Sequence, residues 1–187
     1  MNLDHLMWNE DGWGYLPPSE EVFSAIKETL EITQAKSLFE IGFYAGHSTT
    51  YWAEIMGRDA RILSCCPDHP NGAKYGRVIM DKYPYVQVKL RPSPQIFSEV
   101  VNEKFDLAFI DGSHNEIAPM IDTFLCNQLD IPYYLYDNAE YVHIQEFISE
   151  LEREGHIEVL KNFSYQSNFK GKVTTNQMTL VKNTKIF

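Results

Sequence analysis

Short apolar runs alternate along the chain with segments that have helical spacing. Five of the runs have the length and composition of buried β-strands, and they span residues 37–42, 61–66, 86–90, 105–111 and 133–138. The segments around them place apolar residues three or four positions apart, as amphipathic helices do. They predict helices within residues 19–32, 47–57, 72–83, 94–104, 119–129 and 140–155. In the last of these helices, Val142, Phe147 and Leu151 should share the buried face.

The alternation changes near the C-terminus. Two strand-like runs, residues 156–165 and 176–183, have no helix between them, and their polar connection contains Gly171. This pattern indicates a hairpin rather than a crossover. Five β-α units followed by an antiparallel pair predict a doubly wound α/β fold, with a mostly parallel seven-stranded sheet and an antiparallel C-terminal hairpin. We expect a single domain over residues 1–187, in which residues 1–18 form an aromatic N-terminal arm.

Charge and cysteine content narrow the classes of partner. The chain has a formal net charge of −10 and a pI near 5.0, so most of its surface should repel nucleic acid and anionic membranes. The three cysteines form neither a disulfide framework nor a zinc pattern. The N-terminus lacks a basic start followed by an apolar run, and no apolar stretch is long enough to cross a bilayer. We therefore expect a soluble, cytoplasmic protein.

The residues that follow the strands are unusually polar. Ligands of doubly wound sheets bind at the carboxyl ends of the strands. After the first run, Gly42 and Gly46 allow a tight turn and should leave backbone N–H groups open to a ligand, with Glu40 as an acceptor beneath them. The spacing matches neither the dinucleotide nor the nucleotide-triphosphate motif, which disfavours a polyphosphate. A purely structural turn is the alternative.

A second polar group follows the fourth and fifth runs. Asp111, Asp137 and Asn138 provide two carboxylates and an amide from adjacent strand ends. Such an oxygen-only set suits Mg²⁺ or a similar divalent cation. Alternatively, Asp137 and Asn138 cap the helix that begins near Glu140, and Asp111 belongs to a turn.

Three motifs of the chain resemble those of a known family. The motifs SLFEIGFYAGHSTTYWAEIM, FDLAFIDGSH and YYLYDN, in this order and at these intervals, resemble the class I S-adenosylmethionine-dependent methyltransferases. The closest likeness is to the metal-dependent O-methyltransferases of the catechol and caffeoyl-CoA type, and it extends from about Ser19 to the terminal hairpin. The resemblance implies methyl transfer from S-adenosylmethionine to an oxygen of a small molecule, with Mg²⁺ or a similar divalent cation at Asp111, Asp137 and Asn138.

The resemblance also implies where the cofactor binds. Ser93 would lie near the adenine, and Cys66 stands where the family has an acid that binds the ribose hydroxyls. A thiol is a poor substitute for a carboxylate, so Asp68, two residues on, is the candidate for that contact. The methionine end would meet residues of the first motif, and Asp111 also belongs to the cofactor site; the first-motif residues are Glu40, Gly42, Tyr44, Gly46 and Ser48.

His114 stands where the catechol-type enzymes have a lysine base, and a histidine can take a proton near neutral pH. We predict His114 and Asp111 as catalytic residues; a solvent-exposed loop histidine is the alternative. Two other functions stay open. One is a metal-independent methyltransferase with His114 as base, and the other is a non-catalytic module that binds S-adenosylmethionine or a nucleoside. We expect a small-molecule acceptor and neither a nucleic-acid nor a membrane partner. The sequence does not decide between a monomer and a homodimer.

Overall fold

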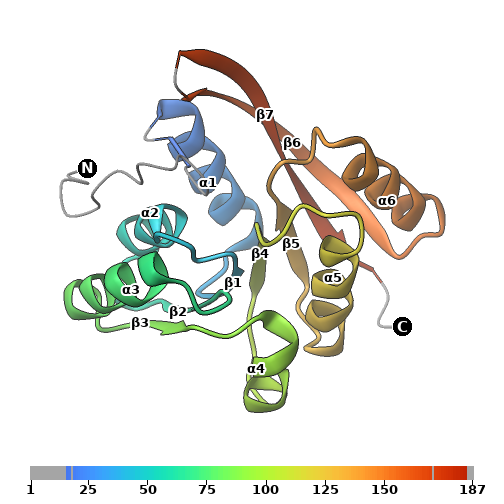
Figure 1. The fold of residues 1–187 in the computed structure, drawn as a ribbon. Coiled ribbons are helices and arrows are strands. Elements are labelled where there is room, and N and C mark those ends of the chain that lie inside the picture. Colours follow the sequence, from blue (N-terminus) through green and yellow to red (C-terminus); the bar gives the residue numbers. More distant parts are fainter. Residues whose placement is uncertain (1–15, 18, 170, 185–187) are drawn as a thin grey trace.

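The computed structural model describes residues 16, 17, 19–169 and 171–184, and its centre is one seven-stranded sheet (Figure 1). The expected N-terminal arm lies mostly outside the described residues. The strands are β1 (Ser37–Ile41), β2 (Arg61–Cys65), β3 (Val86–Lys89), β4 (Leu107–Ile110), β5 (Tyr133–Tyr136), β6 (Ile157–Phe169) and β7 (Lys172–Asn183). Their order in the sheet is β3-β2-β1-β4-β5-β7-β6.

The strand directions confirm the predicted fold class. Strands β1 to β5 pair in parallel, β7 pairs with β5 antiparallel, and β6 pairs with β7 antiparallel. Strands β1, β2, β4 and β5 are short and almost wholly buried, which explains why they appear in the sequence as apolar runs. The edge strand β3 is half-exposed and has an alternating sequence.

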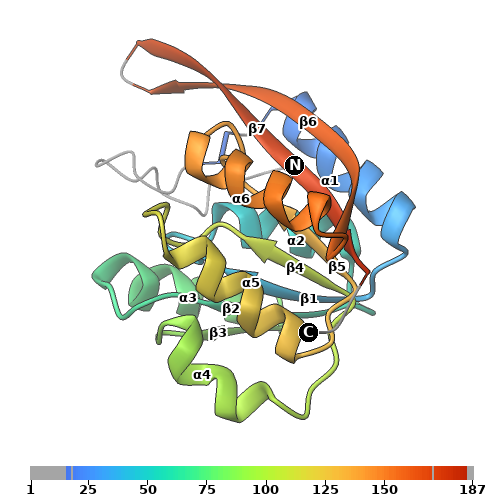
Figure 2. The same ribbon diagram turned by 90° about the vertical axis from the view of Figure 1, so that its right-hand side faces the viewer.

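Helices cover both faces of the sheet. They are α1 (Glu20–Thr33), α2 (His47–Met56), α3 (Pro70–Lys82), α4 (Ser93–Val100), α5 (Ala118–Gln128) and α6 (Val142–Arg153). One apolar cluster joins α1, α2 and α3 to the sheet, and a second joins α4, α5 and α6 to its other face. Figure 2 shows α4, α5 and α6 in front of the strands. In β4, Phe109 contributes to the first cluster and Ile110 to the second. Within the described chain, none of the helices is both long and apolar enough to cross a membrane.

One detail of the predicted packing is wrong. Val142 is the first residue of α6 and is 67% exposed, whereas Ile144 and Ile148 are buried. Phe147 and Leu151 do pack against the core. Helical geometry places Val142 on the same side as the exposed positions 146 and 149, one and two turns later.

The sheet has its topological switch point between β1 and β4. The chain proceeds outward from β1 through β2 to β3 and then returns to β4 on the other side of β1. The ends of β1 and β4 are held together, because Asp111 N donates to Ile41 O over 2.9 Å. In open α/β sheets the loops diverge at this point and leave a crevice for a ligand.

The C-terminal hairpin reaches past this edge of the sheet. β7 pairs with β5 only over Thr179–Lys182, and Thr179 lies opposite Tyr136, the last residue of β5. The part of β7 before Thr179 therefore projects beyond the carboxyl end of β5, paired only with β6. Figure 1 shows the hairpin rising above the rest of the sheet.

Candidate active site

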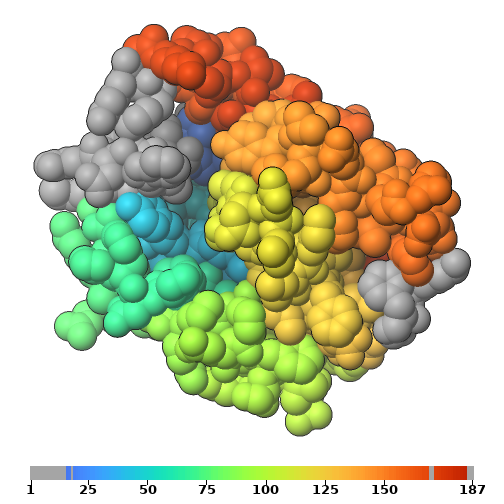
Figure 3. Space-filling view, turned by 45° about the vertical axis from the view of Figure 1, so that its right-hand side comes forward, coloured from blue at the N-terminus to red at the C-terminus, as the bar shows by residue number. Residues whose placement is uncertain are grey.

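A cleft of about 750 Å³ lies at the switch point, a volume typical of small-molecule sites. Its walls come from the loops after β1 to β4, the start of α5 and Tyr141, and Figure 3 shows a recess between the segment that follows β4 and that of α2. A smaller hollow of about 420 Å³ against the start of α5 contains no strand-end residue. The cleft brings together five of the predicted residues, namely Gly42, Tyr44, Ser93, Asp111 and His114.

The other predicted site residues do not line the cleft. Asp68 is exposed to solvent in the loop after β2. The remaining ones are also absent from the cleft wall; they are Glu40, Gly46, Ser48, Asp137 and Asn138.

The N–H groups of the two loop glycines donate to backbone carbonyls of the protein, so these two N–H groups are not open to a ligand. Gly42 N donates to Cys65 O over 2.8 Å, and Gly46 N donates to Phe43 O over 2.6 Å. At Gly42 the φ angle is +119°, and a Cβ there would lie 1.8 Å from Asp111 O. At Gly46 a Cβ would lie 2.2 Å from the Ile79 side chain. The glycines therefore allow β1 to approach β4 and the loop to approach α3.

Glu40 lies beneath the loop rather than in the cleft wall. Its side chain is fully buried. Oε1 accepts a hydrogen bond from Ser48 Oγ over 2.5 Å, and Oε2 accepts hydrogen bonds from the hydroxyls of Thr49 and Ser64. Burial raises the pKa of Glu40 more strongly than these hydroxyls lower it. The carboxyl group thus joins β1 to β2 and to the first turn of α2.

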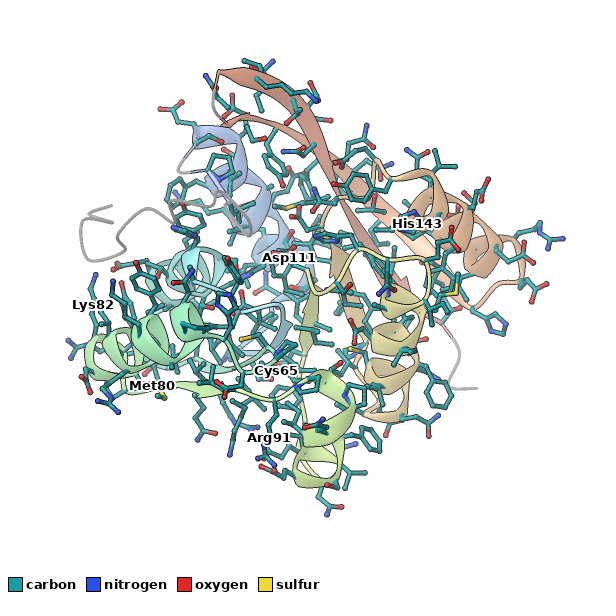
Figure 4. The ribbon with its side chains drawn as sticks, in the orientation of Figure 1. Cys65, Met80, Lys82, Arg91, Asp111 and His143 are labelled. Carbon is teal, nitrogen blue, oxygen red and sulfur yellow. The ribbon has the colours of Figure 1, made fainter. Side chains whose placement is uncertain are left out.

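Two carboxyl groups meet at the ends of β4 and β5. Asp137 is buried and the side chain of Asp111 is 17% exposed. Loss of solvent together with the neighbouring charge of Asp137 raises the pKa of Asp111 well above its ordinary value. Burial raises the pKa of Asp137 to about 7, although Tyr165 Oη donates to its Oδ1 over 2.8 Å. Asp111 lies near the centre of the molecule in Figure 4, where the strand ends converge. Two adjacent acids that resist ionisation are what a cation site shows before the cation binds.

Asn138 does not have the capping role that was the alternative. The N-cap of α6 is Tyr141, and no side chain makes a capping hydrogen bond there. Asn138 Nδ2 instead donates to Glu140 Oε1 over 3.3 Å, and its φ angle is +51°. Among the described residues no three His, Cys, Asp or Glu side chains gather as a metal centre. The expected set has only two carboxylates and an amide, and as oxygen donors they suit a magnesium-like ion.

The acid pair predicts a pH-dependent stability. A carboxyl group whose pKa is higher in the folded state binds its proton more tightly there, so stability is lost as the pH rises from the unfolded to the folded pKa. For Asp137 this window runs from 3.8 to about 7. The test compares the wild type with Asp137→Asn in EDTA. Between pH 4 and pH 7.5 we expect the unfolding free energy of the wild type to fall by more than about 1 kcal/mol beyond any change in the variant. Urea unfolding at both pH values measures the difference; parallel curves would contradict it.

His114 borders both the cleft and the acid pair. Its side chain is 32% exposed, and its Nε2 lies 3.6 Å from Asp111 Oδ1. Its ring makes an edge contact with Tyr141 at a centroid distance of 5.7 Å. Burial lowers the pKa of His114 despite the opposing charge of Glu140. The imidazole is therefore neutral at pH 7 and able to accept a proton.

The end of β2 provides a thiol where an acid was sought. Cys66 lines the cleft and is 6% exposed, and burial raises the pKa of its thiol to about 11. It is therefore an uncharged and weak acceptor at neutral pH. Asp68, the candidate for this contact, lies outside the cleft.

Asp122 and Tyr141 are polar side chains of the cleft wall that were not predicted from the sequence. Asp122 had a detectable signal, because it lies three residues after Pro119 and four before Cys126 on the buried side of α5. A carboxylate on such a face needs a partner or a ligand. Tyr141 had none, because its position depends on how the loop after β5 folds.

Comparisons with known proteins agree with the fold. A family described as a methyltransferase domain matches residues 39–131. An O-methyltransferase from Bacillus cereus in complex with SAH has 17% identity and a TM-score of 0.66, with 89% of this chain and 83% of that chain covered. TomG from Streptomyces achromogenes, an O-methyltransferase of tomaymycin synthesis in complex with SAM, has 17% identity and a TM-score of 0.69, with coverages of 91% and 82%.

The SAH-bound methyltransferase PaMTH1 from Podospora anserina has 19% identity and a TM-score of 0.65, with 95% of this chain and 83% of that chain covered. No curated protein matches the chain. At these identities the structural likeness concerns the fold, and the site must be argued from the residues of this chain.

Proposed function

We propose that the chain is a class I methyltransferase that moves a methyl group from S-adenosylmethionine to an oxygen of a small molecule with the help of a divalent cation. The observation that supports this most is the cleft itself. It unites the glycine loop, Ser93 and Asp111 at the switch point of the sheet. Structures of similar fold that were solved with SAM or SAH add support.

The cleft suits the size and chemistry of S-adenosylmethionine, which when bound supplies its methyl group as a sulfonium. The residues of the chain have to bind and orient it and exclude water. Tyr44 and Gly42 border the loop end of the cleft, and Ser93 borders the end near α4. Asp111 offers a carboxyl group near a positively charged ligand. The thiol of Cys66 makes a weaker contact with sugar hydroxyls than an acid would.

The acceptor would enter beside His114 and Tyr141, which line the cleft next to the acid pair. As the acceptor oxygen forms its bond to the methyl carbon, the hydroxyl must lose a proton. The neutral imidazole of His114 is able to take it. Tyr141 is 42% exposed and packs edge-on against His114, which limits how the ring can turn.

Asp111, Asp137 and Asn138 would hold the divalent cation. A bound Mg²⁺ would lower the pKa of the acceptor hydroxyl and so supply an oxyanion at neutral pH. Tyr165 Oη occupies one lone pair of Asp137 Oδ1 and fixes the orientation of that carboxyl group.

Calorimetric titration with S-adenosylmethionine, in Mg²⁺ and in EDTA, tests the proposal. We expect binding in both buffers and methyl transfer to a hydroxyl acceptor only with the cation. Methyl transfer in EDTA would favour a metal-independent enzyme with His114 as base. Binding without transfer to any acceptor would favour a non-catalytic module, which the missing ribose acid at Cys66 motivates. Absence of binding would reject all three.

The acid pair gives a sharper prediction. Asp137→Ala should abolish the effect of Mg²⁺ on methyl transfer while changing the affinity for S-adenosylmethionine less than about threefold, because Asp137 does not line the cleft. Asp81→Ala is the matched control, since it removes an exposed acid of α3. Equal losses of metal response and of cofactor affinity in Asp137→Ala would contradict the assigned role.

A further inference from the structure

The exposed side of α5 is apolar and has no role in the chemistry above. Four large side chains form a stripe along it, because three of them follow the first by three, four and seven residues. They are Ile117 (64% exposed), Met120 (42%), Ile121 (43%) and Phe124 (55%). Figure 2 shows α5 between α4 and α6, on the side of the molecule that faces the viewer. No other helix or strand of the described chain exposes as many large apolar side chains.

The stripe also lacks charge. The only charged residue of α5 is Asp122, which is buried. Each of the other five described helices has at least one exposed acid. The chain as a whole has a formal net charge of −10, so two copies repel each other over most of their surfaces. A second copy can therefore approach α5 at a lower electrostatic cost than any other helix.

A hollow and a protruding side chain lie at opposite ends of the stripe. The hollow of about 420 Å³ is lined by Ile117 and Ile121 among others, and Phe124 lies seven residues after Ile117, about 10 Å along the helix. If two α5 helices pack antiparallel about a two-fold axis near Ile121, each Phe124 meets the hollow of the other copy. Such an isologous contact uses the same patch on both copies. It also keeps apart the two copies of Glu116, an exposed acid that borders the hollow.

The start of α6 enlarges the apolar surface. Because β4 and β5 are adjacent and parallel, α5 and α6 begin at the same edge of the sheet. Tyr141 and Val142 are 42% and 67% exposed there, and the ring of Tyr141 packs against His114, just before α5. A standard interface has roughly 20–30 residues on each side, so these side chains are the apolar centre of a smaller one. We therefore expect a dissociation constant in the micromolar range.

We propose that α5 is the contact surface of a homodimer, in which it packs antiparallel against α5 of a second copy and Phe124 of each copy occupies the hollow beside Ile117 of the other. Ala118 and Ile121 line the cleft as well as the hollow, so the contact adjoins the cleft and shields its α5 wall from solvent. A lipid surface fits less well, because neither α5 nor the first turn of α6 has a lysine or arginine to meet lipid headgroups.

Sedimentation velocity over a concentration series tests the pairing. The wild type should show a monomer–dimer equilibrium. Phe124→Glu should weaken the association at least about a hundredfold, because a two-fold interface contains the substitution twice and each copy places a charge in an apolar contact. Val173→Glu is the matched control. It adds the same charge at an apolar position of β7 that is 57% exposed, and it should leave the association unchanged.

Disulfide cross-linking tests the arrangement by a second route. A mixture of Ile117→Cys and Phe124→Cys should form a linked dimer with one copy of each under mild oxidation, since these positions face each other and the natural cysteines are buried. The other symmetric contact of that dimer keeps its native side chains. Each variant alone should cross-link much less, because like positions lie about 10 Å apart along an antiparallel pair.

Three results would overturn the proposal. They are a wild type that stays monomeric at every concentration, a dimer that Phe124→Glu leaves intact, and equal cross-linking of the mixture and of the single variants. Flotation of a monomeric wild type with neutral phosphatidylcholine vesicles would assign the stripe to a lipid surface and would also count against the dimer. Thermal melting identifies a variant that does not fold, and the cross-linking then gives the answer. None of these measurements depends on methyl transfer.

Discussion

Replacing Gly42 by alanine is expected to destabilise the protein by about 4 kcal/mol and to weaken S-adenosylhomocysteine binding at least tenfold. The added Cβ would lie 1.8 Å from Asp111 O and 2.4 Å from Asp111 C. Both are backbone atoms, so no side-chain rotation can relieve the overlap. The end of β4 must move away from β1, and Asp111 and Gly112 move with it. Urea unfolding and calorimetry measure the two effects.

Gly57→Ala is the control for backbone conformation. Gly57 has a φ angle of +78°, and a Cβ there would meet nothing within 4 Å. It should cost only the strain of an alanine at a positive φ angle with extended ψ, about 1–3 kcal/mol, and should leave ligand affinity unchanged. If Gly42→Ala behaved like Gly57→Ala, the close approach of β1 to β4 could not be what requires a glycine at position 42.

The fold was predictable because its signals are local. The inner parallel strands are buried on both faces, the edge strand β3 alternates, and each helix is buried on one face. The pattern of apolar residues therefore identifies these elements without knowledge of their neighbours. The antiparallel hairpin follows from the lack of a helix between two strand-like runs. The identification of the chain as a class I methyltransferase followed from motifs at the strand ends. The fold and the match of residues 39–131 to a methyltransferase-domain family agree with it.

The roles of individual site residues depend on distant parts of the chain. The glycine at position 42 is required by the backbone of Asp111, which the sequence places far away. The contact of Tyr165 with Asp137 depends on how far the hairpin projects beyond β5. A residue type at a strand end therefore predicts that a site is near, but not whether the side chain faces a ligand or supports the loop that does.

Glu40 also supports the glycine loop rather than lining the cleft, and its replacement should have the second large effect on stability. Its carboxyl group is the shared acceptor of three buried hydroxyls from α2 and β2. Glu40→Ala removes that acceptor and leaves a cavity, and we expect a loss of about 3–5 kcal/mol in unfolding free energy. Ligand affinity should fall as well, because the first turn of α2 loses its attachment to β1 beneath the glycine loop.

Glu40→Gln is the informative partner variant. Because burial raises the pKa of Glu40 in the fold, the wild type loses stability as the pH rises from the ordinary value of 4.5 toward the folded pKa. Glutamine has nearly the same shape, carries no charge, and leaves the hydroxyls free to reorient toward its oxygen and its amide. The unfolding free energy of the Gln variant should therefore rise relative to that of the wild type between pH 5 and pH 8. The unfolding free energy of the Ala variant should stay well below both. If urea unfolding gave the two variants equal stability at pH 8, the hydroxyls would not need an acceptor at this position, and Glu40 would have to act through the ligand.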